Sequence, residues 1–426
     1  MKNIIFLKEK LTLDFKLFLL GNLFLASAPS ISIILYLYPI IKGIKKNLFE
    51  ILKDKKNYFL LIVTSIMFIK CIFSSIFASG ELEGWNPSLN WIGLGNWIPL
   101  FLVYLGFQPL LRTPNNRALS AKYLIFGTVP VIFSCFSHYF LKWFGPYQIL
   151  NGLIIWFQRP LTELNQPVSG LFNNPNYTGA WLSMIWPFTL ALLSELKYKT
   201  QKFNYSLVFL FCLLMIINFN LVNSRAAWLG LIISIPFMYG KKILNWYIPI
   251  LLLLGTTLLV SILPNVPFII QEFFKNIIPN NILTNFNDLS ISFENLERFL
   301  IWKNSIILIL QKPFLGWGAA SFPLLYFSKT GIWKGHPHNL FFEISISYGL
   351  LASIALFTFI IIIMINSYKC IYIQKNIMNK FERSWWLSSL IFLTLHLFDI
   401  VYFDLRISIF FWMLLSGLNR VKIEKY

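Results

Sequence analysis

Long apolar runs are the feature that most constrains how this chain folds. Stretches such as 243–262 and 340–365 reach about 20 residues or more with almost no charged side chain. A helix of about 20 apolar residues spans the hydrocarbon core of a bilayer. Backbone groups in lipid must hydrogen-bond within the protein, and the alternating segments typical of a barrel are absent. These runs therefore predict transmembrane helices.

Composition supports a chain that lies almost entirely in the membrane. Only 12% of the 426 residues are charged, and 57% are hydrophobic. Soluble domains carry about 25% charged residues, so we predict a single integral membrane domain over 1–426. The formal net charge of +19 would suggest nucleic-acid binding in a soluble protein. Here the basic residues cluster between apolar runs, which favours membrane lipids as partners and excludes nucleic acid.

The apolar runs predict about a dozen spans, and the connections between them are alternately rich and poor in lysine and arginine. Connections rich in lysine and arginine are predicted to be cytoplasmic, as is the basic C-terminus. Lysines before the first run place the N-terminus inside as well. We therefore predict that the break at Ser27–Ser30 divides this run into two short helices, which gives 12 spans. The predicted runs are approximately 17–41, 57–79, 91–111, 122–140, 177–196, 204–222, 226–240, 243–262, 340–365, 385–400 and 405–419.

Two of the predicted outward connections are long, covering 141–176 and 263–339. Long loops on a rigid scaffold commonly carry function. Within the second, 296–312 is apolar with interspersed polar residues, and it is too short to span a bilayer. We predict an interfacial helix on the outer surface of the membrane.

Two arginines are candidates for binding an anion. Arg225 lies between two spans with almost no loop, where a charge is costly and commonly functional, although a snorkelling arginine also fits. Arg298 begins the predicted interfacial helix, where it either pairs with Glu294 or Glu297 or binds an anionic group. Arginine matches phosphate oxygens through two-point hydrogen bonding.

His336 and His338 precede the run 340–365. Two histidines at this spacing suggest a metal, but no carboxylate or cysteine completes a ligand set in the neighbouring sequence, so we predict no metal site. A single histidine acting as acid or base is favoured, because its pKa lies near the operating pH. His138 and His396 lie within spans and are interpreted as residues that pack or form hydrogen bonds within the bundle.

Two further polar groups leave alternatives open. The segment Asn173–Tyr177, which includes Asn176, either caps the next helix or presents amides to a sugar. Asp399, Asp404 and Arg406 form a charged group before the last span. They are either a structural ion pair or a contact to substrate.

Several short motifs between 165 and 365 follow one another in a fairly specific order and spacing. Together they resemble the O-antigen ligase and O-antigen polymerase superfamily of membrane glycosyltransferases. Phe342 departs conservatively from the leucine usual in the histidine motif. The matching residues are Gly170–Asn176, Asn223-Ser224-Arg225, Glu297-Arg298 with Trp302, Lys312–Gly318, and His338-Asn339 with Phe342 and Gly349.

The resemblance implies an all-α polytopic fold of the GT-C-like kind, with 11–12 transmembrane helices and 263–339 as a large extracytoplasmic loop. It implies a ligase core at 165–365 in the inner membrane. The enzyme moves a glycan from undecaprenyl diphosphate to a lipid A core hydroxyl, with inversion and without metal, nucleotide or other cofactor. Arg225 and Arg298 would stabilise the diphosphate, His338 would be the base, and Asn176 and Asn339 would contact substrate.

Two rival functions stay open at this point. A polymerase of the same superfamily would join repeat units, and the motifs do not separate it cleanly from a ligase. A transporter, for inorganic carbon or another solute, should have inverted repeats and ionisable residues near the midplane. The sequence has no evident repeat, and Lys70 is the clearest charge deep in a predicted span.

Overall fold

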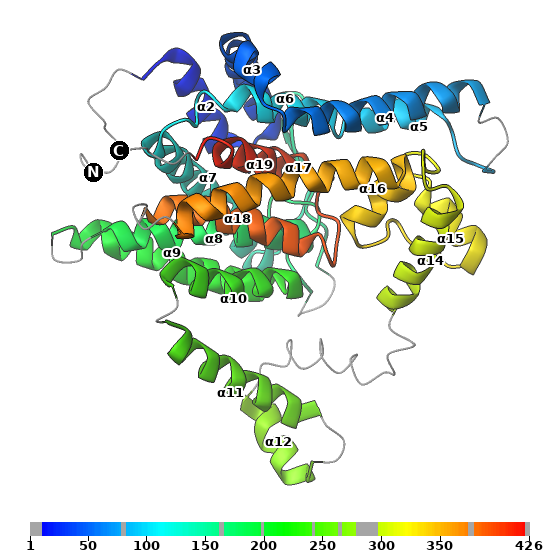
Figure 1. The fold of residues 1–426 in the computed structure, drawn as a ribbon. Helices are drawn as coiled ribbons and strands as arrows, with labels where there is room; N and C mark the ends of the chain where they lie inside the picture. Colours follow the sequence, from blue (N-terminus) through cyan, green and yellow to red (C-terminus); the bar gives the residue numbers. More distant parts are fainter. Residues whose placement is uncertain are drawn as a thin grey trace.

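The structure is a computed structural model that describes residues 11–77, 82–161, 166–196, 200–240, 243–262, 266–277, 297–373 and 379–421, with Arg225 described in its main chain only. The described residues are mainly helical (Figure 1). A short antiparallel hairpin pairs β1 (Tyr147–Ile149) with β2 (Ile154–Trp156). The helices are α2 (Leu13–Phe24), α3 (Pro29–Lys53), α4 (Asn57–Phe77), α5 (Ser88–Leu94), α6 (Ile98–Phe107), α7 (Pro114–Phe140), α8 (Pro175–Glu195), α9 (Lys202–Val222), α10 (Arg225–Tyr239), α11 (Leu244–Ile262), α12 (Phe268–Ile277), α14 (Glu297–Gln311), α15 (Phe322–Thr330), α16 (Leu340–Tyr348), α17 (Leu350–Tyr368) with a π-helical end η4 (Lys369–Ile373), α18 (Lys380–Leu395) and α19 (Leu405–Leu418).

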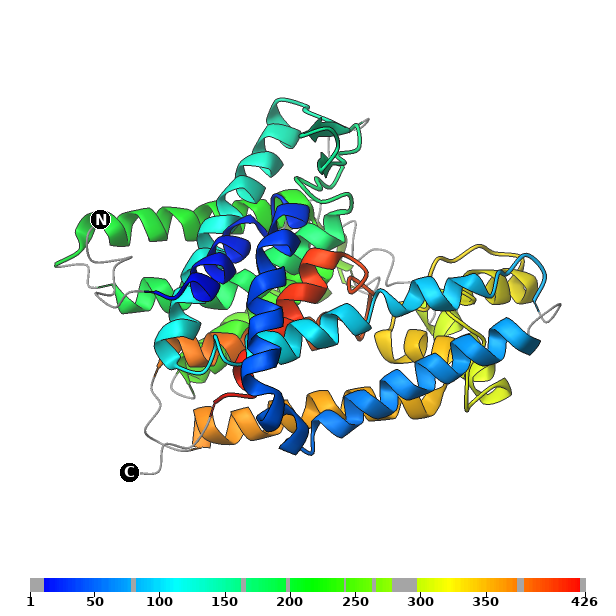
Figure 2. The ribbon, with the colours of Figure 1, turned by 90° about the horizontal axis from the view of Figure 1, so that it is seen from above.

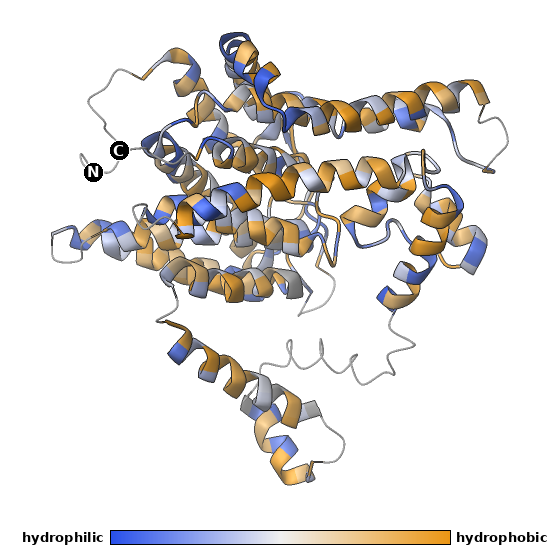
Figure 3. Cartoon of the chain, viewed as in Figure 1, coloured by the Kyte–Doolittle hydropathy of each residue, from blue (hydrophilic) through white to orange (hydrophobic). Residues whose placement is uncertain are grey.

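The length and apolar character of these helices identify a membrane protein. Hydrophobic residues dominate most of the helices (Figure 3). The prediction of an all-α polytopic membrane protein is confirmed, and the count of 11–12 spans stays a prediction. Two further apolar helices are shorter, Ala227–Tyr239 and Leu405–Leu418. Within the described residues, 6 helices are long and apolar enough to cross a membrane: Asn57–Phe77, Ser88–Phe107, Pro114–Phe140, Lys202–Val222, Leu244–Ser261 and Leu350–Ile373.

One helix break falls where the sequence predicts it, and two fall within predicted spans, at 95–97 between α5 and α6 and at Gly349. The run 17–41 divides into α2 and α3, with Pro29 as the first residue of α3, which confirms the predicted break. The predicted single span at 340–365 is wrong, because α16 ends at Tyr348 and α17 begins at Leu350. Gly349 between them has a φ of +92°, and a Cβ there would collide with the carbonyl oxygen of Phe314. The close approach of another segment therefore ends the helix.

The C-terminal helices form the centre of the bundle. Helix α18 packs against α7, α8, α10 and α19, and α19 packs against α6 and α17. Fully buried tryptophans, Trp181, Trp385 and Trp412, fill the space between these helices. Helices α4 and α17 lie side by side and lead to α14 and α15 at one margin, whereas α11 and α12 lie apart from the bundle (Figures 1 and 2).

The connections gather at two opposite sets of helix ends. At the first, named the histidine end, α8 and α10 begin, α18 ends, and α16 begins; there Leu340 N donates to His396 O at 3.1 Å. At the second, named the arginine end, Arg117 beside the start of α7 pairs with Glu382 at the start of α18, 2.8 Å apart. The predicted outward connections meet at the histidine end, and the described parts of the predicted cytoplasmic loops meet at the arginine end.

Candidate active site

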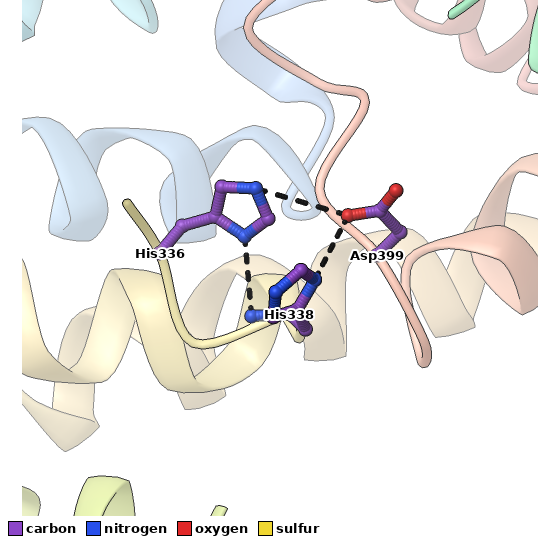
Figure 4. A group of neighbouring side chains, drawn as sticks. All are labelled: His336, His338 and Asp399. Carbon is purple, nitrogen blue, oxygen red and sulfur yellow. Dashed lines mark hydrogen bonds and ion pairs between the residues drawn. The ribbon is translucent and has the colours of Figure 1, made fainter. Parts of the chain in front are cut away.

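Three segments distant in sequence bring one carboxylate, two imidazoles and one amide together at the histidine end. His336 and His338 lie in the connection before α16, and Asp399 lies between α18 and α19 (Figure 4). Asn176 is in the first turn of α8. The side chains of His336, His338 and Asn176 each form a hydrogen bond or a close contact with Asp399.

Asp399 is the centre of this group. Its Oδ1 lies 3.1 Å from Nδ1 of His338 and accepts from the Ile400 amide at 2.9 Å. Its Oδ2 accepts from Nδ2 of Asn176 at 2.9 Å. Burial raises the pKa of this carboxyl, but the hydrogen bond from His338, the neighbouring His336 and the Ile400 amide together lower its pKa below the ordinary value. Asp399 is therefore a carboxylate at neutral pH.

The Asp399 carboxylate sets the orientation of the His338 ring. Because the ionised carboxylate can only accept, Nδ1 of His338 carries the proton in their 3.1 Å hydrogen bond. The lone pair of a neutral ring is then on Nε2. An imidazole with one nitrogen fixed by a carboxylate and the other unprotonated is arranged as a general base.

His336 has a different environment from its neighbour. Its Nδ1 accepts from the backbone N–H of His338 at 3.3 Å, and its Nε2 is 3.8 Å from Oδ1 of Asp399. Burial and, to a lesser extent, the neighbouring His338 lower the pKa of His336 to about 4, and Asp399 offsets only part of this effect. His336 is thus neutral at physiological pH, with its Nε2–H directed at the shared carboxylate.

The backbone at His338 is strained, and Asn339 fixes the turn. His338 has a φ of +53°, which a residue with a Cβ adopts at a cost. Oδ1 of Asn339 accepts from the Phe342 amide at 3.2 Å and caps α16, and its Nδ2 donates to Leu397 O at 3.3 Å. In this structure Asn339 positions the histidines and joins them to the Asp399 segment.

Arg298 approaches the same region on α14. The helix predicted over 296–312 is present as Glu297–Gln311. Trp302, one turn after Arg298, packs against Phe342 of α16 and Phe398 beside Asp399, with ring centroids 6.3 and 6.5 Å apart. Residues four apart share a helix face, so Arg298 lies on the face that meets this group. The predicted partner Glu297 pairs with Lys334, and Glu294 lies outside the described residues.

Arg225 is the first residue of α10, and its side chain lies outside the described residues. The preceding Ser224 packs closely against Gly179, where an added Cβ would lie 2.8 Å from the Ser224 Cβ. Gly179 follows Asn176 by less than one turn of α8. The main chain of Arg225 therefore lies near the N-terminal end of α8, which carries Asn176.

The glycine-rich stretch at 313–318 supports α16 from behind. Trp317 N donates to Ile346 O at 2.6 Å, and Gly318 N donates to Ser347 O at 3.0 Å. Nζ of Lys70, buried in α4, donates to Gly316 O at 2.9 Å. The charge deep in a predicted span thus holds a loop of the site.

The pair formed by Asp404 and Arg406 resolves one alternative from the sequence. Nε of Arg406 donates to Oδ1 of Asp404 at 2.9 Å, and Nη1 donates to Leu171 O at 2.9 Å. The guanidinium lies 3.6 Å from the ring centroid of Phe172. This pair is structural and fixes the segment before α8, whereas Asp399 belongs to the histidine group.

His336, His338 and Asp399 also have the geometry of a metal-binding group, because one ligand atom from each lies within 4.8 Å of the others. The argument that no carboxylate completes a ligand set was wrong, since it considered only nearby sequence and Asp399 is 61 residues from His338. Metal independence stays a prediction. The donor set, two imidazoles and a carboxylate, suits a divalent cation such as zinc.

Sequence reasoning missed one buried acid. Glu343 lies in α16 with a relative exposure of 8%, inside a run that appeared almost free of charge. Its Oε1 accepts from Oγ of Ser347 at 3.2 Å. An acid within an apolar run is itself a signal, because burying a carboxylate is costly.

Comparison with known proteins agrees with the motifs. Residues 210–357 match the family model described as O-antigen ligase. The match supports the O-antigen ligase and polymerase superfamily. It covers Arg225 on α10, Arg298 on α14 and both histidines in the connection before α16, whereas Asn176 and Asp399 lie outside it. No curated protein matches the chain.

The superfamily match supports a general kind of activity. Such proteins are membrane enzymes of the glycosyltransferase kind that act on lipid-linked glycans. The resemblance inferred from the motifs is confirmed at this level, and so is a membrane location with several spans. The match is common to ligases and polymerases.

Proposed function

We propose that the protein is an inverting O-antigen ligase of lipopolysaccharide biosynthesis. It transfers a glycan from undecaprenyl diphosphate to a hydroxyl of lipid A core or a similar acceptor. The hydroxyl oxygen forms a bond to the anomeric carbon while the bond from that carbon to the diphosphate breaks. The hydroxyl proton passes to His338, and undecaprenyl diphosphate leaves.

The hydrogen bond between His338 and Asp399 is the observation that carries this proposal. It leaves the lone pair of the neutral ring on Nε2 and stabilises the imidazolium that forms when the hydroxyl gives up its proton. Asn176 holds the second carboxylate oxygen and so fixes the orientation of Asp399. In this mechanism Asp399 and Asn176 are positioning residues, and the base is His338.

Arginine side chains supply the other half of the chemistry. Negative charge grows on the diphosphate as the glycosidic bond breaks, and preorganised cations lower the barrier to that step. Arg298, on the α14 face that meets α16, and Arg225, at the start of α10, are assigned to this role. Asn339 acts through the α16 cap that holds the histidine turn.

We assign the active site to the extracytoplasmic side of the inner membrane, with the core at 165–365. Connections 141–176 and 263–339 both reach the histidine end, while lysine and arginine gather at the arginine end. The positive-inside rule then places the histidine end outside.

The test is transfer by the purified full-length protein in proteoliposomes. Glycan-linked undecaprenyl diphosphate and lipid A core are supplied, and products are separated by size. A glycan joined to lipid A core supports the ligase. Longer glycans that remain on undecaprenyl diphosphate indicate the polymerase instead, and no transfer of either kind contradicts both. A deletion strain should lose long surface polysaccharide and accumulate lipid-linked chains.

A further inference from the structure

A cavity of about 350 Å³ lies beside the histidine group. It is lined by α5, the 95–97 turn, the start of α15 and one face of α16, together with His336 and Phe403. Its volume falls within the roughly 300–1,000 Å³ typical of small-molecule sites. The ring centroids of His336 and His338 are 4.3 Å apart, so a molecule in this cavity lies next to the proposed base.

The cavity is built from fixed parts. Oδ1 of Asn90 accepts from the Ala319 amide at 2.7 Å, and Nε1 of Trp85 donates to Ala319 O at 2.9 Å. Gly318 N donates to Ser347 O at 3.0 Å and attaches this loop to α16. Because hydrogen bonds hold this wall on both sides, the site is preformed. Ligand binding then costs less conformational entropy, since the side chains and loop are already ordered.

Two polar groups of α16 lie in this mostly apolar cavity. The Glu343 side chain is buried, with Ser347 as a hydrogen-bond donor. The buried Oη of Tyr348 has no hydrogen-bond partner among the described residues. Buried polar groups normally have partners, so a molecule that donates to Glu343 and reaches Tyr348 would complete this wall.

Lining and shape select the kind of molecule. The Glu343 carboxyl accepts hydrogen bonds from hydroxyl groups, and the described residues that line the cavity include no lysine or arginine to hold a diphosphate. Two aromatic residues, Trp97 and Phe403, line the same cavity. Apolar aromatic walls with a few fixed polar groups fit the C–H faces and hydroxyls of a neutral sugar ring.

We propose that this cavity is the acceptor subsite, in which Glu343 accepts a hydrogen bond from a hydroxyl of the acceptor's terminal sugar. The proposal rests on the proposed transferase function. It separates the two substrates across the histidines: the diphosphate of the donor lies with the arginines, and the acceptor sugar lies with Glu343, Tyr348 and the aromatic rings.

The kinetic test uses Glu343→Gln, which keeps the side-chain shape and replaces one accepting oxygen with a donating NH2 group. An ordinary hydrogen bond contributes about 0.5–1.5 kcal/mol, so its loss corresponds to a rise of roughly 2- to 13-fold in the KM for lipid A core. The KM for the lipid-linked donor should stay unchanged, as should kcat at saturating acceptor. A change confined to the donor KM, or an unchanged acceptor KM, overturns the subsite.

A labelling test does not require catalysis. Ala320 is exposed and lines the cavity, and all four native cysteines are buried, so Ala320→Cys gives a single reactive thiol. Lipid A core oligosaccharide freed of its acyl chains should slow maleimide labelling at this position at least threefold. The exposed control Lys329→Cys on α15, which does not line the cavity, should label at an unchanged rate.

The outcomes separate the two proposals. Protection by the oligosaccharide without any transfer activity supports the subsite and contradicts the ligase. Transfer activity without protection overturns the subsite and leaves the ligase standing. Protection by undecaprenyl diphosphate, and not by the oligosaccharide, assigns the cavity to the donor and also overturns the proposal. The labelling experiments keep Glu343 unchanged, so their results can be interpreted even if the Glu343→Gln variant does not fold.

Discussion

The two ends of the helical bundle use charge in different ways. At the arginine end, opposite charges meet: Arg117 pairs with Glu382 at 2.8 Å, Arg420 pairs with Glu50 at 2.6 Å, and Lys122 lies 3.6 Å from Glu195. At the histidine end, a cavity of about 350 Å³ is lined by polar side chains that include His336, Glu343 and Asn96. Charges that satisfy each other join helices, whereas polar groups around a cavity can act on a ligand.

Surface labelling is expected to give an all-or-none difference between these ends. Lys329→Cys should react with an impermeant maleimide in intact cells, and Lys46→Cys should react only after the cells are opened, because inner loops carry the lysines. Both positions are exposed in the structure. The reverse pattern would invert the orientation and place the histidines in the cytoplasm.

His338→Ala should cause the largest loss of activity. General base catalysis contributes roughly 10²–10⁴-fold, so transfer in proteoliposomes should fall by about that factor while donor binding persists. His336→Ala should lose less, and a chelator should have no effect on the wild-type enzyme. Equal losses in both variants together with inhibition by a chelator would instead indicate a metal held by His336, His338 and Asp399.

Arg117→Met tests whether the arginine end is structural. The Arg117 and Glu382 side chains are 3% and 1% exposed, so the variant leaves a buried, unpaired carboxylate and should lose about 3–5 kcal/mol of stability. Thermal unfolding in detergent measures the effect. The matched control is Arg112→Ala, which breaks a half-exposed pair with Glu50 and should cost roughly 0–1 kcal/mol.

The double variant Arg117→Met with Glu382→Leu should recover most of this stability, because neither charge is then left without a partner. If Arg117→Met unfolds no more readily than Arg112→Ala, the buried pair is not what joins α7 to α18.

Arg225→Ala should lose most transfer activity, and Arg225→Lys should lose much of it, because a point charge replaces a two-point donor. The donor KM should rise in both variants, with thermal unfolding unchanged. Wild-type transfer by Arg225→Ala with purified donor would remove Arg225 from the site. Arg298→Lys provides the parallel measurement on α14.

The smallest expected effect is a change in the pH dependence of folding stability. The pKa of folded His336 is about 4, below its ordinary 6.5, so the unfolded chain takes up the proton first as pH falls. The contribution of His336 to the free energy of unfolding should therefore decrease as pH falls from about 6.5 towards 4. His336→Gln should reduce that decline in the unfolding temperature. The lowered pKa of Asp399 acts only below its ordinary value of 3.8, outside this window.

Local patterns predicted much of the fold. The break between α2 and α3 followed from Pro29, and helix α14 followed from an amphipathic stretch ended by Pro313. The break at Gly349 did not follow, because it depends on the approach of Phe314, which lies 35 positions earlier in the chain. Hydropathy averages over a window and does not register a contact with a distant segment.

The residues of the candidate site also divide into those that the sequence predicted and those that only the structure identified. The sequence by itself determined that the chain spans a membrane, and it selected His338, Arg298 and Arg225 through residue type, position and short motifs. Only the tertiary structure decided that Asp399 orients His338, that Arg406 belongs to Asp404, and that Lys70 holds Gly316. It also placed Glu343 in a cavity beside His336. The physical reason is that apolar length and charge bias act locally along the chain, whereas hydrogen bonds form between groups that packing alone brings within about 3 Å.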